Sequence, residues 1–595
     1  MTKTIAQSLG LLLLLCGTSL FAQLEPRTPF ENGNGNQSAT YAEVIAFYKQ
    51  LQTEVPDKVH VVEYENGTDA GEPLHLVLIT SDGGNWHPVP FRKKDKRFVF
   101  INNGIHPGEP CGIDASMILA RDLAKDRIYQ SLLDHIVVCI IPVYNVGGAL
   151  NRNSTSRTNQ TGPEAYGFRG NARNLDLNRD FIKADSRNAR AFARIFHEWM
   201  PDLFVDTHTS NGADYQYRMT YLATQKDKLQ PVLSQYMTQQ LIPNMEKAMQ
   251  DAEYEMCPYV QSKSWGMPPD SGLVAFMDYP RYSSGYASLF NVINFTTETH
   301  MLKPFEDRVF GTYHFLLNLL KFVNRDRKYI ARFRKEADAA IQAQTEFPLT
   351  WELNTNAKRM ITFKGYTAGT KTSQVTGKPR LYYDREAPFT KEIPYFDTYR
   401  SVKRVNKPAA YIIPQAWKQV IDRLKDNKVV MKRLSKDIDL EVETYYIDSY
   451  ESRKEPYEGH YLHYNIKLDK VKQSRKFRQG DYVIVPDQVR NRYIVESLEP
   501  EADDSFFNWN FFDSILMRKE YFSTYVFEDE AAQLLESNPE WKQEMQTRMA
   551  QDSAFAANSW AQLDYIYRRS DHYEVTHKRY PVARLLSPTK LPLMK

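Results

Sequence analysis

Short apolar runs alternate with segments of helical spacing along the first half of the chain. The runs at 98–102 and 135–143 are rich in β-branched residues, which is typical of buried strands. Segments 113–123 and 187–199 place apolar residues at helical spacing. We expect further elements of the same kind at 38–52 (helix), 60–64, 74–79, 202–206 and 292–297 (strands). This alternation predicts an α/β fold from about 60 to 325, with a mixed, mostly parallel sheet flanked by helices.

The pattern changes after a long, increasingly charged helical stretch at 305–344. Glu346-Phe347-Pro348 marks its end, and Pro, Tyr and Lys are more frequent beyond it. Short strands are expected at 380–383, 410–413, 440–447, 461–468 and 482–485, with one helix at 415–425. A chain of 595 residues is too long for a single core. We therefore predict an α/β domain over 23–345 and a β-rich accessory region over 346–595.

The first 22 residues have the pattern of a bacterial-type signal peptide. Lys3 is followed by an apolar run at 11–15, and small Ala22 fits the position before a cleavage site. The run is too short to span a bilayer, and we expect no membrane span later in the chain. These features predict export to the periplasm or the medium.

The remaining cysteines and the net charge argue against a disulfide-rich protein and against a nucleic-acid-binding protein. Cys111, Cys139 and Cys257 are too few for a disulfide framework, so one bridge and three buried thiols both remain open. The net charge of +3 gives no general attraction to nucleic acid. The oligomeric state cannot be predicted from these features.

Two segments at predicted strand ends offer metal ligands. His106 and Glu109 follow the strand at 98–102, within Asn102-Asn103-Gly104-Ile105-His106-Pro107-Gly108-Glu109. His208 follows the strand at 202–206. Two histidines and one carboxylate form one of the ligand sets of a catalytic zinc, which keeps a fourth position open for water. Each histidine alone is more typical of a surface or core residue; together, at the ends of predicted strands, they indicate a metal site.

A second carboxylate stands at another strand end. Glu298 follows the apolar run at 292–297, where it could accept a proton from a metal-activated water. His300 lies two residues further on and is expected to be a solvated loop residue.

Four motifs occur together and in order: GIHPGEP, RNLDLNRDF, VDTHTS and NFTTETH. As a set, they resemble the carboxypeptidase A-like zinc carboxypeptidase family across about 60 to 325. The resemblance implies a secreted metallopeptidase that binds one zinc ion and acts on peptides with a free C-terminal carboxylate. Residues 346–595 lie outside it.

The resemblance also implies roles for individual residues. His106, Glu109 and His208 would bind zinc, and Glu298 would be the general base. Further roles follow by position: Asp176 would support the first zinc histidine, Arg169 would stabilise the oxyanion, and Asn178 and Arg179 would hold the substrate carboxylate. Arginine suits the last role because its planar fork meets a carboxylate with two parallel hydrogen bonds.

The family has a mobile tyrosine that covers the substrate. Tyr279, Tyr282 and Tyr286 are candidates here, and we favour Tyr282. The residue that sets the side-chain preference in the family should lie within 283–286. No acidic residue stands there, so a preference for basic C-terminal residues is not indicated.

Three alternatives remain open. The same zinc site could release acyl groups from amino acids or cut cell-wall stem peptides, which also end in a carboxylate. The fold could serve as a binding protein without activity, although such a protein would need a broken ligand set. The aromatic segment 506–512 could bind sugars, but packing in a core is the stronger prediction.

Overall fold

The computed structural model describes residues 26–263 and 266–594, so the predicted signal peptide lies outside the described residues. An eight-stranded mixed sheet forms the centre of the first half, in the order β1-β2-β4-β3-β5-β9-β6-β7. Its strands are β1 (Val59–Tyr64), β2 (Leu74–Ile79), β3 (Arg97–Asn102), β4 (Ile136–Ile141), β5 (Leu203–Ser210), β6 (Met219–Ala223), β7 (Met256–Pro258) and β9 (Ile293–His300). Strands β4, β3, β5 and β9 are parallel neighbours, as the α/β prediction requires.

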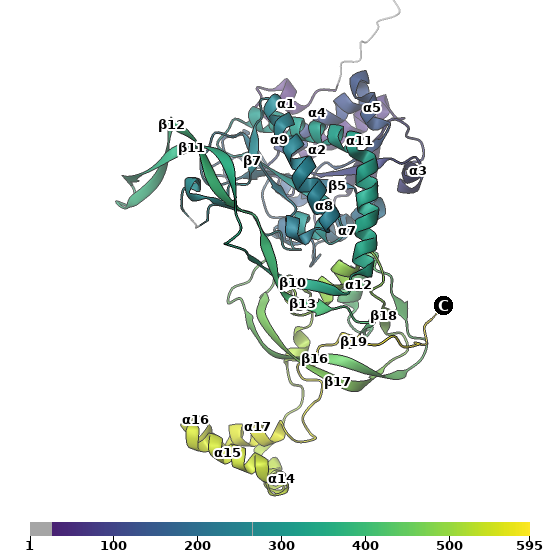
Figure 1. The fold of residues 1–595 in the computed structure, drawn as a ribbon, viewed down its shortest axis with the longest axis vertical. Helices are drawn as coiled ribbons and strands as arrows, with labels where there is room; N and C mark the ends of the chain where they lie inside the picture. Colours follow the sequence, from purple (N-terminus) through teal and green to yellow (C-terminus); the bar gives the residue numbers. More distant parts are fainter. Residues whose placement is uncertain (1–25, 264–265, 595) are drawn as a thin grey trace, which may run out of the picture.

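Helices cover both faces of this sheet (Figure 1). The longer ones in this half are α2 (Tyr41–Glu54), α4 (Cys111–Lys125), α7 (Arg187–Trp199), α9 (Ile242–Asp251) and α11 (Phe305–Ala343). Shorter ones are α1 (Pro29–Asn32), α3 (Pro88–Lys93), α5 (Gln130–Leu133), α6 (Val146–Leu150), α8 (Pro231–Tyr236) and α10 (Ser283–Ser288). Between α8 and α9 the chain forms a π-helical turn, Met237–Leu241.

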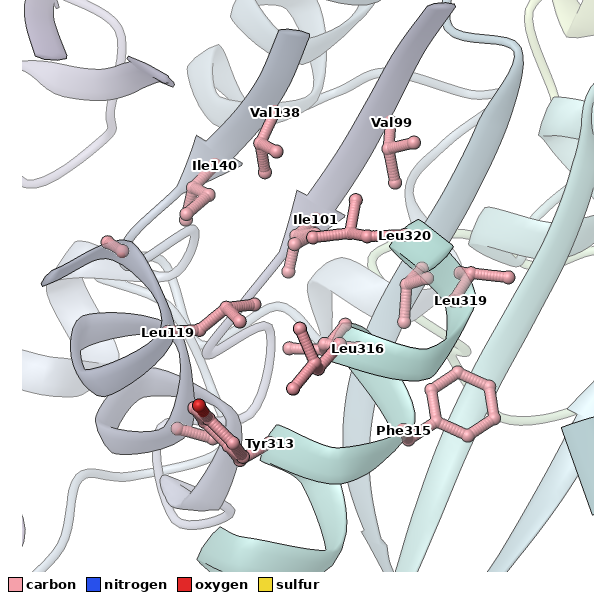
Figure 2. Packing of buried hydrophobic residues seen from close by; sticks show 14 of the residues in the cluster. Val99, Ile101, Leu119, Val138, Ile140, Tyr313, Phe315, Leu316, Leu319 and Leu320 are labelled. Atoms are coloured by element: carbon pink, nitrogen blue, oxygen red, sulfur yellow. The ribbon is translucent and has the colours of Figure 1, made fainter. Parts of the chain in front are cut away.

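Alternate strand residues separate into two cores because side chains point to opposite faces along a strand. On one face, Val99, Ile101, Val138 and Ile140 pack against α4 and α11 (Figure 2). Leu119 of α4 and a group from α11 (Tyr313, Phe315, Leu316, Leu319, Leu320) fill this core. The opposite residues, such as Phe98 and Phe100, face α7 and α10.

The region after α11 contains ten strands among the described residues, and all but the last of them end before residue 485. It comprises β10 (Glu346–Leu353), β11 (Arg359–Thr372), β12 (Pro379–Phe396), β13 (Tyr399–Asn406), β14 (Ala410–Ile413), β15 (Lys432–Arg433), β16 (Ile438–Ser452), β17 (His463–Phe477), β18 (Tyr482–Ile484) and β19 (Ala583–Leu585). Six of them form a sheet in the order β15-β18-β14-β19-β16-β17. The hairpin β11–β12 joins the first half instead, because β12 pairs with β8 (Leu273–Val274).

Helices complete this region. They are α12 (Lys418–Asp426), α13 (Asn491–Leu498), α14 (Thr524–Ser537), α15 (Pro539–Gln551), α16 (Ser553–Ala556) and α17 (Ser559–Tyr567). The last four have their own hydrophobic cluster and project away from the rest of the molecule, in yellow in Figure 1. The region is therefore β-rich, as predicted, with a helical extension that the sequence analysis does not anticipate.

A single hydrophobic cluster crosses position 346. It includes Phe204 and Tyr286 from the first half together with Tyr411, Tyr493 and Trp509 from the second. The aromatic segment 506–512 belongs to it: Phe506, Phe507, Trp509 and Phe512 are fully buried. Their burial supports the core interpretation over sugar binding. Strand β10 begins at Glu346, where the sequence analysis places a domain boundary, but that division remains a prediction.

Several expectations can be compared directly with the described residues. The long helix, the helix at 187–199 and the strand at 74–79 are confirmed. The expectation for His300 is wrong: this residue lies within β9, is 1% exposed and faces Asp214 at 3.3 Å. Cys111, Cys139 and Cys257 are free and buried. Within 26–263 and 266–594, no helix has the length and apolar character that crossing a bilayer requires.

Candidate active site

The three predicted ligands meet at the carboxyl ends of β3 and β5. His106 and Glu109 lie on the loop between β3 and α4, and His208 lies within β5. One ligand atom from each residue falls within 4.8 Å of the other two. All three side chains are buried, at 2–3% exposure. The loop turns at Gly104 with φ of +65°, a left-handed conformation that favours glycine.

Each histidine has a carboxylate at the nitrogen that points away from Glu109. His106 Nε2 lies 2.9 Å from Asp176 Oδ1, and its Nδ1 lies 3.3 Å from Glu109 Oε1. His208 Nε2 lies 3.3 Å from Asp206 Oδ2, and its Nδ1 lies 3.1 Å from Glu109 Oε2. Carboxylate partners of this kind fix the ring orientation of metal-binding histidines.

These donors fit a zinc ion. His106 Nδ1 is buried and finds no hydrogen-bond partner among the described residues, although it lies 3.3 Å from Glu109 Oε1. Burial raises the pKa of Glu109, but Arg157 and then His106 outweigh that effect and hold it well below its usual range. Burial lowers the pKa of His208, but Asp206 and Glu109 together raise it well above its usual value. A deprotonated carboxylate and two convergent imidazoles form a zinc-binding set, and His208 would have to release its proton when the ion binds.

Glu298 is the direct neighbour of His208 in the sheet. Strands β5 and β9 are parallel, and the two residues are partners in their register. Their side chains therefore leave the sheet on the same face, and both line the same cavity. Burial is the largest influence on Glu298 and raises its pKa to about 8; His208 opposes this shift and Glu109 adds to it.

Arg169, Asn178 and Arg179 lie on the segment between α6 and α7. Arg169 is the most exposed of them, at 45%, and its Nη2 lies 2.9 Å from Asp176 Oδ2. The Arg179 guanidinium donates to the carbonyl oxygen of Asn178 at 2.9 Å and is centred 4.7 Å from the ring of Tyr282. Burial lowers the pKa of Arg179, but Asp176, Tyr282 and Tyr457 outweigh this effect. The pKa therefore lies above its usual value, and this group carries a fixed positive charge.

A cavity of about 480 Å³ connects these groups. Every predicted site residue except Asp176 lines it, and Asp176 is bonded to His106 behind the wall. The three candidate ligands and the candidate base all lie at this cavity, so the broken ligand set expected of an inactive binding protein is not seen among the described residues. The cavity wall also includes Ser156, Thr158, Asn159, Gln160, Thr209, Ser210, Asn211, Leu222, Phe276, Ser283, Ser284, Thr296 and Met301.

The three candidate tyrosines occupy different environments. Tyr282 lines the cavity and packs edge-on against Phe276, with ring centres 4.9 Å apart. Tyr286 is fully buried, donates to Asn427 Oδ1 and is not among the described residues of the cavity wall. Tyr279 is not among the described residues that form the wall. Tyr282 is therefore the candidate that the structure brings to the site.

Among the cavity residues that the sequence did not indicate, Arg157 and Tyr259 lie beside the candidate ligands and base. Arg157 Nη1 donates to Glu109 Oε1 at 2.9 Å, and Gln160 holds its Nε at 2.7 Å. Tyr259 lines the cavity near Glu298 and Glu109, whose charges add to burial in raising its pKa. Arg157 stands in a polar loop and Tyr259 is one of 37 tyrosines, so neither carries a signal in the sequence.

The fold and the arrangement of the candidate site are those expected of a zinc metallopeptidase, and comparison with known proteins finds a similar family. Residues 44–256 match the family model described as zinc carboxypeptidase. This range includes the three candidate metal ligands and the Asn178-Arg179 pair, and it ends before Glu298. This part of the chain is similar to the zinc carboxypeptidase family, and the similarity supports peptide hydrolysis at a general level.

Curated relatives and solved structures carry the same names. Carboxypeptidase 2 of Trichophyton rubrum is 22% identical over 428 residues, covering 69% of this chain and 72% of that protein. Carboxypeptidase 2 of Trichophyton tonsurans is 21% identical over the same length. A metallo-carboxypeptidase structure from Burkholderia cenocepacia is 19% identical, covers 48% of this chain and 70% of its own, and superimposes with a TM-score of 0.36.

Proposed function

We propose that this enzyme removes the C-terminal residue of peptides that end in a free carboxylate. The observation that supports this most is the content of one cavity: a three-ligand metal site, a paired second carboxylate, and an arginine-asparagine pair. A substrate whose carboxylate is held by Asn178 and Arg179 would present its last peptide bond to the metal site. Internal peptide bonds lack that carboxylate, so the pair would set the register of cleavage.

One zinc ion would be held by His106, Glu109 and His208. When bound, it supplies Lewis acidity that makes a water more acidic and polarises the scissile carbonyl. Asp176 and Asp206 keep the two imidazoles in the orientation that leaves both Nδ1 atoms facing Glu109.

Glu298 would act as the general base. Its position beside His208 places it next to the ligands without making it one of them. It would accept a proton from the attacking water and later give that proton to the leaving amine. No other described carboxylate lines the cavity apart from Glu109.

Arg169 would stabilise the charge that develops on the carbonyl oxygen. Its guanidinium reaches toward Glu109 Oε1 at 3.6 Å, and nearly half of the side chain is open to solvent. Tyr282 would cover the bound substrate, since it lies against Arg179 at the cavity wall.

A substrate panel tests the proposal. The wild-type protein is incubated with zinc and a blocked dipeptide, the same dipeptide as its C-terminal amide, and a cell-wall stem peptide. We expect the free acid to be cleaved at least about a hundredfold faster than the amide, because the amide leaves Arg179 without its partner. Equal rates would overturn the exopeptidase proposal. Cleavage of the stem peptide alone would favour the cell-wall alternative.

We also propose that the protein is exported, with residues 1–22 as the signal peptide. Expression of the full chain in a bacterial host, followed by fractionation and N-terminal mass measurement, tests this. A mature protein that begins at Gln23 outside the cytoplasm supports export, and an intact Met1 form in the cytoplasm contradicts it.

A further inference from the structure

The segment 169–185 carries Arg169, Asp176, Asn178 and Arg179 but has little regular structure. Only Leu177–Arg179 forms a single 3₁₀ turn within it. Some of its backbone groups bond within the segment, such as the Asn171 N–H to the Leu175 carbonyl oxygen, and the others need partners outside it. We call it the arginine segment.

The first partner of the arginine segment comes from the second half of the chain. The turn 453–462 connects β16 and β17 of the six-stranded sheet. Within it, Glu458 Oε2 accepts a hydrogen bond from the backbone N–H of Asp176 at 2.7 Å. Glu458 and Gly459 both have positive φ, +49° and +82°, so the turn is tight where it meets the segment. Gly459 also lies beside Leu175, the residue before Asp176.

The same turn holds the end of the arginine segment. His460 Nε2 lies 2.7 Å from Asp185 Oδ2. Arg423 of α12, also beyond residue 346, lies 3.0 Å from the other oxygen of Asp185. The charged groups of this contact are mostly shielded from solvent, so the segment is fixed at both Asp176 and Asp185 by later parts of the chain.

A third contact lies on the side of Tyr282. The Arg281 guanidinium is centred 5.5 Å from the ring of Tyr457 and 5.2 Å from that of Trp509. Its Nη2 also forms an ion pair with Asp504 Oδ1 at 2.6 Å. Residues from the second half of the chain therefore hold the segment on either side of Arg179 and the backbone next to Tyr282, where the Arg281 N–H donates to Asp504 Oδ2.

The geometry points to Glu458 as a positioning residue for Asp176 and Arg179, so that the turn 453–462 completes the carboxylate-binding part of the active site. This inference rests on the proposed function. Asp176 holds His106 through its carboxylate and is held by Glu458 through its amide, and Arg179 follows three residues later. A small displacement of this segment would move the carboxylate-binding pair relative to the metal ligands. The turn lies outside residues 44–256, the part of the chain that matches the family model.

Three variants of the full-length protein separate positioning from simple packing. Glu458→Ala removes the acceptor, Glu458→Gln keeps an oxygen that can accept from Asp176, and Glu455→Ala alters an exposed carboxylate of the same turn. We expect Glu458→Ala to raise KM for the free-acid dipeptide about tenfold while kcat changes little. This change corresponds to the loss of one hydrogen bond near a charged site. Glu458→Gln should restore most of the affinity, and Glu455→Ala should match the wild type.

Amide hydrogen exchange tests the link without relying on activity. Peptides that span 171–182 should exchange faster in Glu458→Ala than in the wild type, because the Asp176 amide loses its acceptor, and should be protected again in Glu458→Gln. Unchanged exchange in Glu458→Ala overturns the inference. A normal KM for this variant with faster exchange also overturns it, because the contact would then be structural only. A wild type that cleaves no peptide defeats the proposed function while leaving the exchange result intact.

Discussion

His208 and Glu298 are paired partners on the parallel strands β5 and β9. This relationship places a metal ligand and an acidic side chain next to each other on one face of the sheet, although 90 residues separate them in the chain. Strand pairing is more rigid than a loop contact, so the distance between the two groups is set by the sheet itself. The general base would thus be positioned by the same ladder that positions the metal.

The carboxylate behind His106 should control metal affinity. Replacing Asp176 by Asn removes the charge at His106 Nε2 and should weaken zinc binding about 10–100-fold. Competition with a fluorescent zinc chelator measures the affinity. Asp126→Asn, at an exposed turn after α4, is the control and should bind zinc like the wild type. Equal affinity in both variants would show that Asp176 does not support the ligand.

Metal removal should lower the thermal stability of the first half of the chain. The ligands lie on two strand ends that a bound ion would join, and an ion that binds only the folded state stabilises it by mass action. Differential scanning calorimetry after chelation should show a lower Tm that zinc restores. A Tm unaffected by chelator and by added zinc contradicts the assignment of the site.

Arg179 should decide affinity for the substrate carboxylate. Arg179→Ala should reduce kcat/KM for the free-acid dipeptide about 10–100-fold, mostly through KM, since a charge-assisted hydrogen bond is lost. The rate on the amidated dipeptide should hardly change. Arg173→Ala, an exposed arginine of the same segment, serves as the control. Loss of activity on both substrates alike would assign Arg179 a structural role instead.

Arg169 should act on the rate more than on binding. Arg169→Ala should lower kcat on the order of a hundredfold or more while KM changes little, as expected when a group stabilises charge that develops only during the reaction. Steady-state kinetics on the free-acid dipeptide gives both constants. A rise in KM with unchanged kcat would show that Arg169 binds the ground state.

Asp114 should make stability depend on pH. This carboxyl lies in the first turn of α4, is fully buried, and accepts from the Ala39 amide; burial raises its pKa to about 8. In the unfolded chain its pKa is about 3.9, so between about pH 4 and pH 8 the folded state binds more protons and its contribution to stability falls as pH rises. Asp114→Asn removes this loss. Its Tm relative to the wild type should therefore increase by a few degrees from pH 5 to pH 8, and a difference independent of pH contradicts the shift.

Much of the fold follows from local patterns. Strands such as β3 and β4 are short apolar runs with every residue buried, so their sequences carry the signal directly. Strand β5 extends further than predicted because Thr207, His208 and Thr209 continue the ladder despite their polarity. Helices α14 and α15 are missed because Phe527 and Ala531 are their only buried residues, which leaves a weak apolar pattern.

Some residues of the candidate site could also be predicted from local patterns, and others could not. His106, Glu109, His208 and Glu298 stand next to predicted strands, so topology alone indicates that they meet. Glu458 does not stand next to a predicted strand. Its contact with Asp176 comes from a turn 282 residues further along the chain, and no local sequence pattern indicates that the two segments meet. Contacts of this kind depend on how two regions pack together.

The substitution Glu298→Gln tests the central claim most directly. It preserves the shape of the side chain next to His208 but removes its ability to accept a proton. We predict that this variant retains the zinc content of the wild type, binds the free-acid dipeptide with similar affinity and loses turnover by about a hundredfold or more. Glu246→Gln, a half-buried carboxylate outside the cavity wall, should remain active. A Glu298→Gln protein with full zinc content and wild-type turnover would contradict the role of Glu298 as the base.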